Sequence, residues 1–318
     1  MAIERTIASL PDVKYGKPGL RILEDIRKNK YIYLMLVPVL AYYLIFHYGP
    51  MYGAIIAFKD YSPAEGILGS QWVGLKNFSD FLTGFYFWRV FKNTLLISLY
   101  QLIFGFPAPI ILALLLNEVR ITLFKKVVQT VSYMPHFISL VVVCGIIKEF
   151  TAREGVINYI IGLLGGNQTN LLLKPEYFKS IYVISEIWQN VGWNTIIYIA
   201  ALSAIDTGLY EASKIDGAGR WKQVLHITIP GIKPVVVIML ILQMGYIMGV
   251  GTEKILLLYS PLTFDTADVI STYVYRRGIL EFSYSFSSAV GLFNSMINFI
   301  LVISANWISR KVNETSLW

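Results

Sequence analysis

Polar residues recur at helical spacing within an otherwise apolar stretch of this sequence. Glu186, Asn190 and Asn194 stand four residues apart, so they share one face of a helix, and Gln189 and Trp193 form the neighbouring ridge. Carboxylate and amide groups can hydrogen-bond a hydroxyl-bearing solute, but they also hold helices together inside a membrane. The spacing therefore leaves two interpretations open, the lining of a solute path and the packing of helices.

Two further apolar stretches carry similar polar side chains. Gln243 and Tyr246 lie in one of them, and Asn294 and Asn298 lie four residues apart in the other. Because polar side chains are costly to expose to lipid, we expect them to face an interior path or a neighbouring helix. The predicted path comprises Glu186, Gln189, Asn190, Trp193, Asn194, Gln243, Tyr246, Asn294 and Asn298. Asn190, Trp193 and Asn194 are the main candidates for contact with a solute.

The sequence offers few residues that could support catalysis. A membrane-embedded enzyme would need convergent acids and bases, yet the three histidines, His47, His136 and His226, stand isolated in the sequence. The single cysteine, Cys144, excludes an internal disulfide and a cysteine-based metal cluster. The phosphate-binding pattern G-x-x-x-x-G-K-[ST] does not occur, so the chain is not expected to bind ATP. We expect no catalytic residue, no metal and no bound cofactor.

The composition is that of a membrane protein. Of the 318 residues 55% are hydrophobic and only 15% are charged, and the mean hydropathy is +0.57. A bilayer core needs about 20 apolar residues for each helix that crosses it. Six stretches reach that length, and we predict an all-α polytopic protein with six transmembrane helices. They cover approximately residues 31–56, 90–116, 127–150, 181–205, 232–258 and 286–308.

The distribution of positive charge predicts the orientation of these helices. If both termini are cytoplasmic, more than half of the 27 Lys and Arg residues fall on cytoplasmic segments, as the positive-inside rule requires. Such residues can also contact anionic lipid, whereas nucleic-acid binding would need a basic domain that the sequence lacks. We therefore expect a multi-pass membrane protein with both termini in the cytoplasm. The predicted parts are an N-terminal segment 1–30, a transmembrane domain 31–308 and a tail 309–318.

Three outward connections are too long to be simple turns. Residues 57–89, 151–180 and 259–285 each exceed the usual length of a loop without structure of its own. We expect them to carry short helices, one of them in "FSDFLTGFYFWRV", whose aromatic residues suit the membrane interface.

A polar island interrupts the apolar pattern at residues 211–230, "EASKIDGAGRWKQVLHITIP". Asp206 and Thr207 are good N-cap residues for a helix of about two turns, and Gly217 permits a sharp turn after it. A second short helix is expected to end at Pro230. Its predicted stripe, which follows helical spacing, comprises Trp221, Val224, Leu225 and Thr228. Because so short a helix is marginal alone in water, the island is predicted to dock on a partner.

The island also resembles a family pattern. The permease subunits of ABC importers carry a cytoplasmic loop of the form EAA, three residues, G, nine residues, I, one residue, LP. Glu211, Ala212 and Ser213, then Gly217, Ile227, Ile229 and Pro230, follow this spacing. Ser213 in place of Ala and Ile229 in place of Leu are the two departures.

The resemblance extends over nearly the whole chain. The segments "WVGLKNF" at 72–78 and "NTLLIS" at 93–98 are similar to segments of sugar importer permeases of the maltose-transport type. The segments "FHYGPMYGAIIAFKDY" at 46–61 and "YMPHFIS" at 133–139 resemble a narrower group, the LplB-type permeases of oligosaccharide and polysaccharide uptake.

This resemblance implies a type I ABC importer permease fold, a place in the bacterial cell membrane and a set of partners. They are a second permease subunit, two ATPase subunits that use ATP and Mg²⁺, a lipid-anchored or periplasmic solute-binding protein, and a saccharide. The loop 206–230 would then couple the chain to the ATPase. The coupling residues are Glu211, Ala212, Ser213, Asp216, Gly217, Trp221, Leu225, Ile227 and Pro230. The alternatives are an ABC permease for a non-sugar solute, a secondary transporter or channel, and a membrane-embedded enzyme.

Overall fold

The structure is a computed structural model, and it describes residues 27–313. The predicted N-terminal segment up to residue 26 and the tail from residue 314 lie outside the described residues. The described residues divide into two units, one up to Ile55 and one from Ile56. The only β structure within 27–313 is a hairpin of two short strands, β1 (Lys59–Asp60) and β2 (Gln71–Trp72), which pair antiparallel. The prediction of an all-α protein is confirmed.

The first predicted span is an almost wholly apolar helix of 29 residues, Lys30–Phe58. It consists of α3 (Lys30–Tyr43), a π turn η1 (Leu44–Tyr48), α4 (Gly49–Met51) and a 3-10 helix η2 (Tyr52–Phe58). No residue of α3 is buried within the chain. Such a surface suits lipid or another membrane helix.

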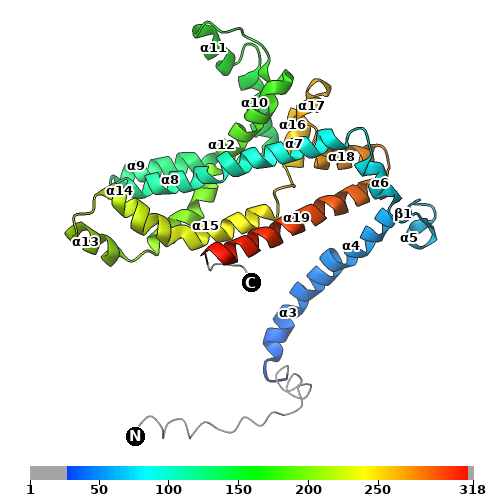
Figure 1. The fold of residues 1–318 in the computed structure, drawn as a ribbon, viewed down its shortest axis with the longest axis horizontal. Helices are drawn as coiled ribbons and strands as arrows, with labels where there is room; N and C mark the ends of the chain where they lie inside the picture. Colours follow the sequence, from blue (N-terminus) through cyan, green and yellow to red (C-terminus); the bar gives the residue numbers. More distant parts are fainter. Residues whose placement is uncertain (1–26, 314–318) are drawn as a thin grey trace. The chain divides into compact units, whose positions relative to one another are not determined.

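Long helices form the framework of the second unit. They are the helix Phe87–Glu118, made of α7 (Phe87–Tyr100), a π turn η3 (Gln101–Gly105) and α8 (Pro107–Glu118), then α12 (Pro175–Ser203), α15 (Ile229–Met244) and α19 (Tyr284–Asn313). Helix α12 packs against α8, α9 (Thr122–Tyr133) and α15, and Figure 1 shows it crossing the α7–α8 helix. The central position of α12 explains why its polar face lies inside the bundle.

The predicted third span, 127–150, is not one straight helix. Helix α9 is followed by a 3-10 turn η4 (Met134–Phe137), α10 (Leu140–Thr151) and α11 (Val156–Leu163), and the helical axis bends by 103° at the break. Pro135 lies in this turn, where its ring and missing N–H group disfavour a continuous helix. The prediction of a continuous helix here is wrong.

The predicted fifth span, 232–258, is also interrupted. Helix α15 ends at Met244, residues 245–251 are not helical, and α16 covers Thr252–Leu258. Gly245, Gly249 and Gly251 fall in this gap, and glycine weakens a helix because it loses much conformational freedom on ordering. The predicted helix up to residue 258 is therefore corrected to one that ends at Met244.

The number of spans depends on how the broken helices are counted. Within the described residues four helices are long and apolar enough to cross a membrane, and the bent pair would make a fifth. Helix α12 has 29 residues, but Glu186, Gln189, Asn190 and Asn194 lower its hydropathy. The count of six stays a prediction.

Short helices occupy the long connections, as predicted. They are α5 (Gly66–Gly69), α6 (Lys76–Leu82), α11, η5 (Leu171–Leu173), η7 (Pro261–Thr263), α17 (Phe264–Ala267), α18 (Ile270–Tyr275) and the π turn η8 (Arg276–Leu280). The helix expected across "FSDFLTGFYFWRV" is split, because α6 ends at Leu82 and α7 begins at Phe87.

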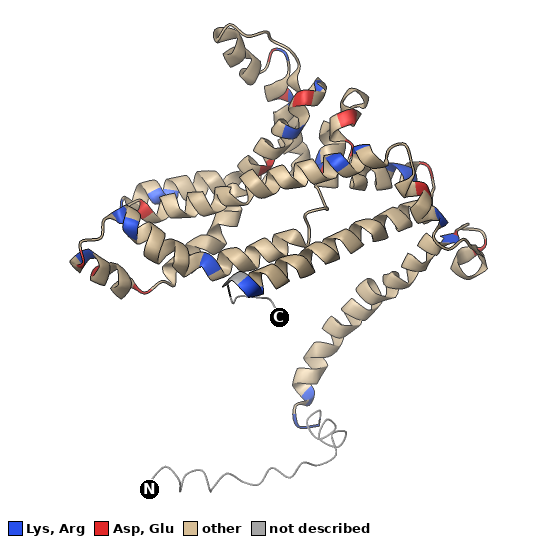
Figure 2. Cartoon of the chain, viewed as in Figure 1, with Lys and Arg blue, Asp and Glu red and all other residues tan. Residues whose placement is uncertain are grey.

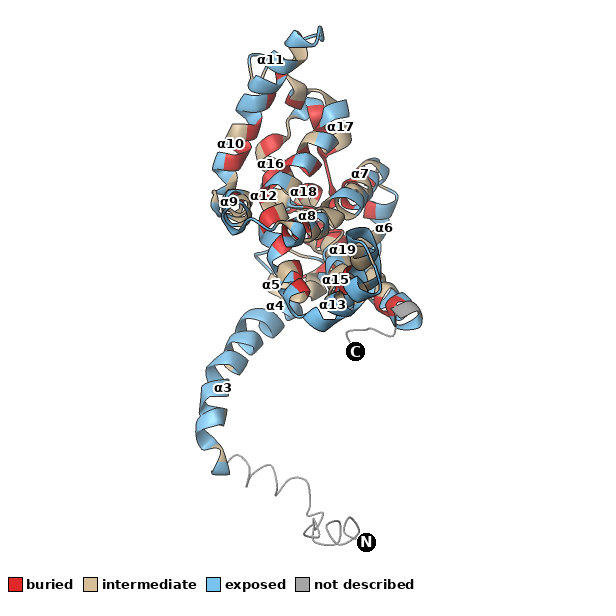
Figure 3. Cartoon of the chain, turned by 90° about the vertical axis from the view of Figure 1, so that its left-hand side faces the viewer, coloured by how far each residue is buried: buried red, intermediate tan, exposed pale blue. Residues whose placement is uncertain are grey.

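The core of the second unit lies where α12 meets its neighbours. One cluster joins Ile97 of α7, Cys144 of α10, Phe178 and Tyr182 of α12, and Ile255 of α16, and Figure 3 shows the buried residues gathered on these inner faces. Long parts of α8, α15 and α19 carry no charge, and charged residues gather near their ends (Figure 2). This pattern fits helices that cross lipid.

Candidate functional site

Glu186 is the centre of a polar junction on α12. Its Oε2 lies 2.8 Å from Nζ of Lys254, and its Oε1 accepts a hydrogen bond of 2.7 Å from Nδ2 of Asn190. The Lys254 side chain is only 3% exposed, whereas that of Glu186 is 31% exposed. Oε1 of Gln189 lies 3.5 Å from the same Nζ. A buried ammonium is stable only when paired, so Glu186 and Gln189 hold α16 against α12.

His136 extends the junction to the break between α9 and α10. Its Nδ1 lies 3.0 Å from Oδ1 of Asn190. Because Nδ2 of Asn190 donates to Glu186, Oδ1 is the accepting atom, so Nδ1 of His136 carries a proton. The imidazole ring also stacks on Trp193, with centroids 4.6 Å apart and planes at 4°. His136 stands isolated in the sequence, but in the structure it contacts two residues of the predicted path.

Three cavities meet at Glu186. The first has a volume of about 260 Å³, the second about 590 Å³ and the third about 180 Å³, and Glu186 lines all three. Asn190 lines the first and second, and Gln243 the first and third. The remaining predicted path residues found in these linings are Asn194 in the first cavity, Gln189 in the second and Tyr246 in the third.

The other three predicted path residues lie elsewhere. Trp193 packs on His136 and edge-on to Phe137. Oδ1 of Asn298 accepts a hydrogen bond of 3.1 Å from the backbone N–H of Met248, and Nδ2 of Asn294 donates to the backbone oxygen of the same residue at 3.4 Å. The two asparagines therefore support the gap between α15 and α16. Their contact with a solute stays a prediction.

Sequence reasoning missed Lys254 and Gln101 as parts of this junction. Lys254 lies in the second half of the predicted fifth span, and the gap before α16 brings it to α12. Gln101 starts the π turn η3 and lines the first and third cavities. The lone Lys and Gln inside apolar stretches were the available signals, since such residues rarely face lipid.

The junction offers hydrogen bonds rather than catalysis. Its ion pair joins Lys254 to Glu186, and Glu253 adds a second carboxylate beside the second cavity. Its other polar groups are His136 and several amides. Within residues 27–313 no group of three or more His, Cys, Asp or Glu side chains could hold a metal ion. Amides and carboxylates around cavities that share Glu186 suit a hydroxyl-rich solute.

The polar island forms two helices joined by a tight turn. Helix α13 (Thr207–Ile215) starts at Asp206, whose side chain accepts a hydrogen bond from the backbone N–H of Gly208, so the predicted N-cap is confirmed. Gly217 has φ of +77°, the left-handed region that favours glycine. Helix α14 (Arg220–Gln223) and the π turn η6 (Val224–Thr228) follow.

Side-chain contacts hold the two parts of the island together. Nε2 of Gln223 donates to Oγ of Ser213 at 2.9 Å, and the hydroxyls of Tyr210 and Thr228 lie 3.0 Å apart. Ser213 and Thr228 thus serve the island internally. The left-handed glycine and these hydrogen bonds fix the angle between the helices.

Most of the predicted coupling residues lie on the surface of the island. Trp221 is 81% exposed and Leu225 is 57% exposed. Glu211, Ala212, Asp216, Gly217 and Pro230 are exposed as well, whereas Ser213 and Ile227 are half-buried. Ile215, which is not among the predicted coupling residues, is 87% exposed. Three large apolar side chains exposed on one short segment suit a partner surface.

Pro230 does not end the second helix of the island, contrary to the prediction. The helix runs from Arg220 through η6 into α15 without a break and ends at Met244. The π turn immediately before Ile229 changes the hydrogen-bond pattern, so a proline in the next turn need not break the helix. The island is therefore rigidly continuous with α15.

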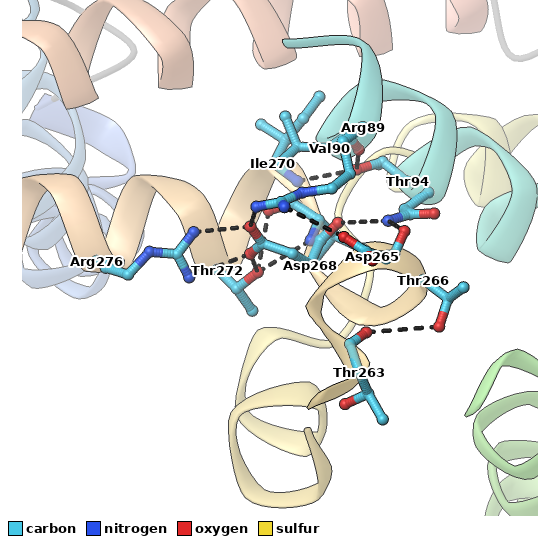
Figure 4. A network of polar contacts seen from close by, with 12 residues as sticks. Arg89, Val90, Thr94, Thr263, Asp265, Thr266, Asp268, Ile270, Thr272 and Arg276 are labelled. Atoms are coloured by element: carbon cyan, nitrogen blue, oxygen red, sulfur yellow. Dashed lines mark hydrogen bonds and ion pairs between the residues drawn. The ribbon is translucent and has the colours of Figure 1, made fainter. Parts of the chain in front are cut away.

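A second polar network joins α7 to the α17–α18 turn (Figure 4). Asp268, whose side chain is fully buried, lies 2.7 Å from a guanidinium nitrogen of Arg276 and 3.3 Å from one of Arg89. Oγ1 of Thr272 donates to Asp268 Oδ1, and Nδ2 of Asn93 donates to the Asp268 backbone oxygen. Burial alone would lower the pKa of Arg276, but the hydrogen bond and charge of Asp268 raise it. This network was not predicted, and it is a structural clamp.

Comparison with known proteins gives relatives of full length. The chain is 46% identical over 299 residues to the polygalacturonan/rhamnogalacturonan transport system permease protein YteP of Bacillus subtilis, covering 94% of this chain and 93% of the relative. It is 43% identical over 309 residues to protein LplB of the same organism, covering 97% of each.

A solved structure of a bacterial alginate ABC transporter, in complex with an alginate pentasaccharide-bound periplasmic protein, contains a similar chain. The TM-score is 0.87 and the identity 40%, with 93% of this chain and 100% of that chain covered. The description "binding-protein-dependent transport system inner membrane component" matches residues 105–314, which include the whole island and the junction on α12 except Gln101. The chain therefore belongs to the family of binding-protein-dependent transport system inner membrane components.

Proposed function

We propose that this chain is a permease subunit of an ATP-driven ABC importer for a saccharide. The observation that carries the proposal is the rigid, exposed island at 206–230, which continues directly into a bundle helix and lies on the same chain as a polar junction with three cavities. The island can receive force from a partner, and the polar junction can let a solute pass.

The island is the proposed docking element for an ATPase subunit. Trp221, Leu225 and Ile215 supply apolar contacts, and Glu211 and Asp216 supply polar ones, since all five are exposed. Because α14, η6 and α15 form one helix, a displacement of the island moves α15 as well. Helix α15 packs against α12 and α19, so the movement reaches the polar junction.

The junction is the proposed path for the saccharide. Sugars present many hydroxyl groups, and the amides of Asn190, Asn194 and Gln243 with the carboxylate of Glu186 offer donors and acceptors beside the cavities. The relatives named for polygalacturonan, rhamnogalacturonan and alginate support an oligosaccharide or polysaccharide fragment as the substrate.

The complete importer is proposed to contain a second permease, two ATPase subunits and an extracellular or periplasmic binding protein. ATP and Mg²⁺ are used by the ATPase subunits and not by this chain. The island and both termini are proposed to face the cytoplasm. Arg120 in the turn after α8, with Lys125 and Lys126 near the start of α9, also follows the positive-inside rule on that side.

Reconstitution of the assembled complex tests this proposal. The chain is co-expressed with its cognate second permease, ATPase and binding protein, and the complex is placed in proteoliposomes that contain ATP. We expect saccharide uptake that requires the binding protein, and we expect no ATP hydrolysis by the purified chain alone. ATP hydrolysis by the isolated chain, or binding-protein-dependent uptake of a non-sugar solute only, would contradict the proposal.

A further inference from the structure

A glutamine in the π turn of the α7–α8 helix lies beside the Glu186 junction. Gln101 lines the first and third cavities, and it shares both linings with Glu186 and Gln243. Nε2 of Gln101 is shielded from solvent and has no hydrogen-bond partner within the described part of the chain. A buried donor without a partner is unfavourable, so a ligand that supplies an acceptor at this point gains affinity.

Gly105 leaves the space that the Gln101 side chain occupies. A Cβ atom at position 105 would lie 2.7 Å from Oε1 of Gln101, which is closer than two such atoms can approach. The π turn brings the two residues together, and it is closed by a hydrogen bond of 2.9 Å from the Phe106 N–H to the Gln101 backbone oxygen. The glycine therefore allows the amide to lie against its own helix and face the cavities.

The groups around the two cavities match a hydroxyl group. An amide N–H of Gln101 donates a hydrogen bond, and the carboxylate of Glu186 has lone pairs beyond those used by Lys254 and Asn190. A sugar hydroxyl accepts and donates at once, so it can satisfy both residues. A carboxylate substituent only accepts, and it would also be repelled by the negative charge of Glu186.

We propose that Gln101 is a substrate-contacting residue that recognises a hydroxyl group of the saccharide, with Glu186 as the second partner of that hydroxyl. Gly105 is the positioning residue, because it determines where the Gln101 amide lies. The inference rests on the proposed transport of a saccharide, and it assigns to the π turn a role in substrate recognition.

The test uses the complete importer in proteoliposomes, with oligosaccharides of polygalacturonan, rhamnogalacturonan and alginate, and maltotriose, as probes. The probe that the wild-type complex takes up is then measured with Gln101→Leu. We expect the maximal uptake rate to fall about tenfold, as for the loss of one buried hydrogen bond. Basal ATP hydrolysis and the amount of assembled complex should not change.

Two further variants separate recognition from structure. Gly105→Ala should also lower uptake, because the added methyl group would displace Oε1 of Gln101. In the Gln101→Leu background it should cause no further loss of uptake, since leucine has no atom in the place of Oε1. Cδ of Gln101 lies 3.7 Å from the added methyl position, which is an ordinary contact. Ile103→Ala, in the same π turn but with an exposed side chain, is the matched control and should transport normally.

The outcomes distinguish this inference from the proposed function. Normal uptake by Gln101→Leu in a complex whose wild type transports saccharide would overturn the inference alone. Reduced assembly or basal ATP hydrolysis in Gln101→Leu would overturn it in favour of a structural role. A wild-type complex that takes up no saccharide would overturn the proposed function and the inference together.

Discussion

The Glu186 junction and the polar island are two polar regions of an apolar chain, and they are built in opposite ways. The island comes from one continuous segment, and its turn and internal hydrogen bonds lie within residues 206–228. The junction brings His136 and Lys254 from two helix breaks to Glu186 and Asn190 on α12. A change in the island should therefore act locally, whereas a change in the junction should disturb the packing of several helices.

Burial adds a second difference between the two regions. The charges of the island are exposed, and exposed charges contribute little to stability. Lys254 is almost fully buried, so removing its partner leaves a charge that water cannot reach. Membership of this family confirms the expectation that the chain is a transport subunit. Both regions can therefore be tested in the same transport complex.

Gly192→Ala should have the largest effect. A Cβ atom at position 192 would lie 2.1 Å from the backbone oxygen of Ser132 and 2.3 Å from its carbonyl carbon, so α9 and α12 would have to separate. We expect a loss of about 3 kcal/mol or more in stability and little protein in the membrane. Gly145→Ala in α10, where no atom lies within 4 Å of the added methyl, is the control. A normal amount of Gly192→Ala with an unchanged melting temperature would contradict the described contact.

Lys254→Met should have an intermediate effect. It leaves the Glu186 carboxylate without its main cationic partner, and breaking a buried pair costs about 3–5 kcal/mol. Because the Glu186 side chain is 31% exposed and keeps access to water, we expect a loss below that range, about 1–2 kcal/mol, measured as a lower melting temperature of the complex in detergent.

The double variant Lys254→Met with Glu186→Gln tests whether charge causes this loss. Since it removes both charges, we expect much of the stability to return, although transport should stay low if Glu186 contacts the saccharide. A double variant less stable than Lys254→Met would show that the pair is not coupled.

Gly217→Val should leave the folded bundle nearly unchanged. A residue other than glycine in the left-handed region costs about 1–2 kcal/mol of stability, and a β-branched side chain raises this cost. We therefore expect the angle between α13 and α14 to change. We expect normal membrane amounts and normal pairing with the second permease, but weak ATPase binding and no transport. Gly219→Val is the matched control, because Gly219 has φ of −72° and open space around it. Wild-type ATPase co-purification and normal uptake by Gly217→Val would show that the island is not the coupling element.

The contrast between the regions also explains what the sequence could predict. The N-cap at Asp206, the turn at Gly217 and the exposed Trp221 depend on neighbouring residues, and the structure agrees with each. The end of the second helix at Pro230 was wrong, because the preceding π turn lets the helix continue. The predictions that rest on neighbouring residues were therefore correct except at the π turn, where the backbone hydrogen-bond pattern changes.

The junction could be predicted only in part. The shared face of Glu186 and Asn190 follows from helical spacing, and the structure joins them by a hydrogen bond. Their partners Lys254 and His136 are 68 and 54 residues away from the residues they contact, and they reach α12 only because two predicted spans are broken. Hydropathy gave no sign of those breaks, although Pro135 and the glycines of 245–251 offered a local one.

Asn190→Ala and Asn194→Ala should have the smallest effects on folding, and their comparison separates the two interpretations of the polar face. Asn190 links Glu186 to His136, so its removal should cost about 1 kcal/mol of stability. Asn194 is exposed and lines the first cavity, and it has no side-chain hydrogen bond among the described residues.

Asn194→Ala should therefore leave the melting temperature unchanged, because it removes no internal contact. If the face lines the solute path, saccharide uptake by this variant should fall several-fold while binding-protein-stimulated ATP hydrolysis continues. If the face only packs helices, Asn194→Ala should transport at the wild-type rate and Asn190→Ala should lose stability and uptake together. The second result would confine the role of α12 to support of the bundle, since Asn194 is the residue of this face that has access to the cavity and no structural bond to lose.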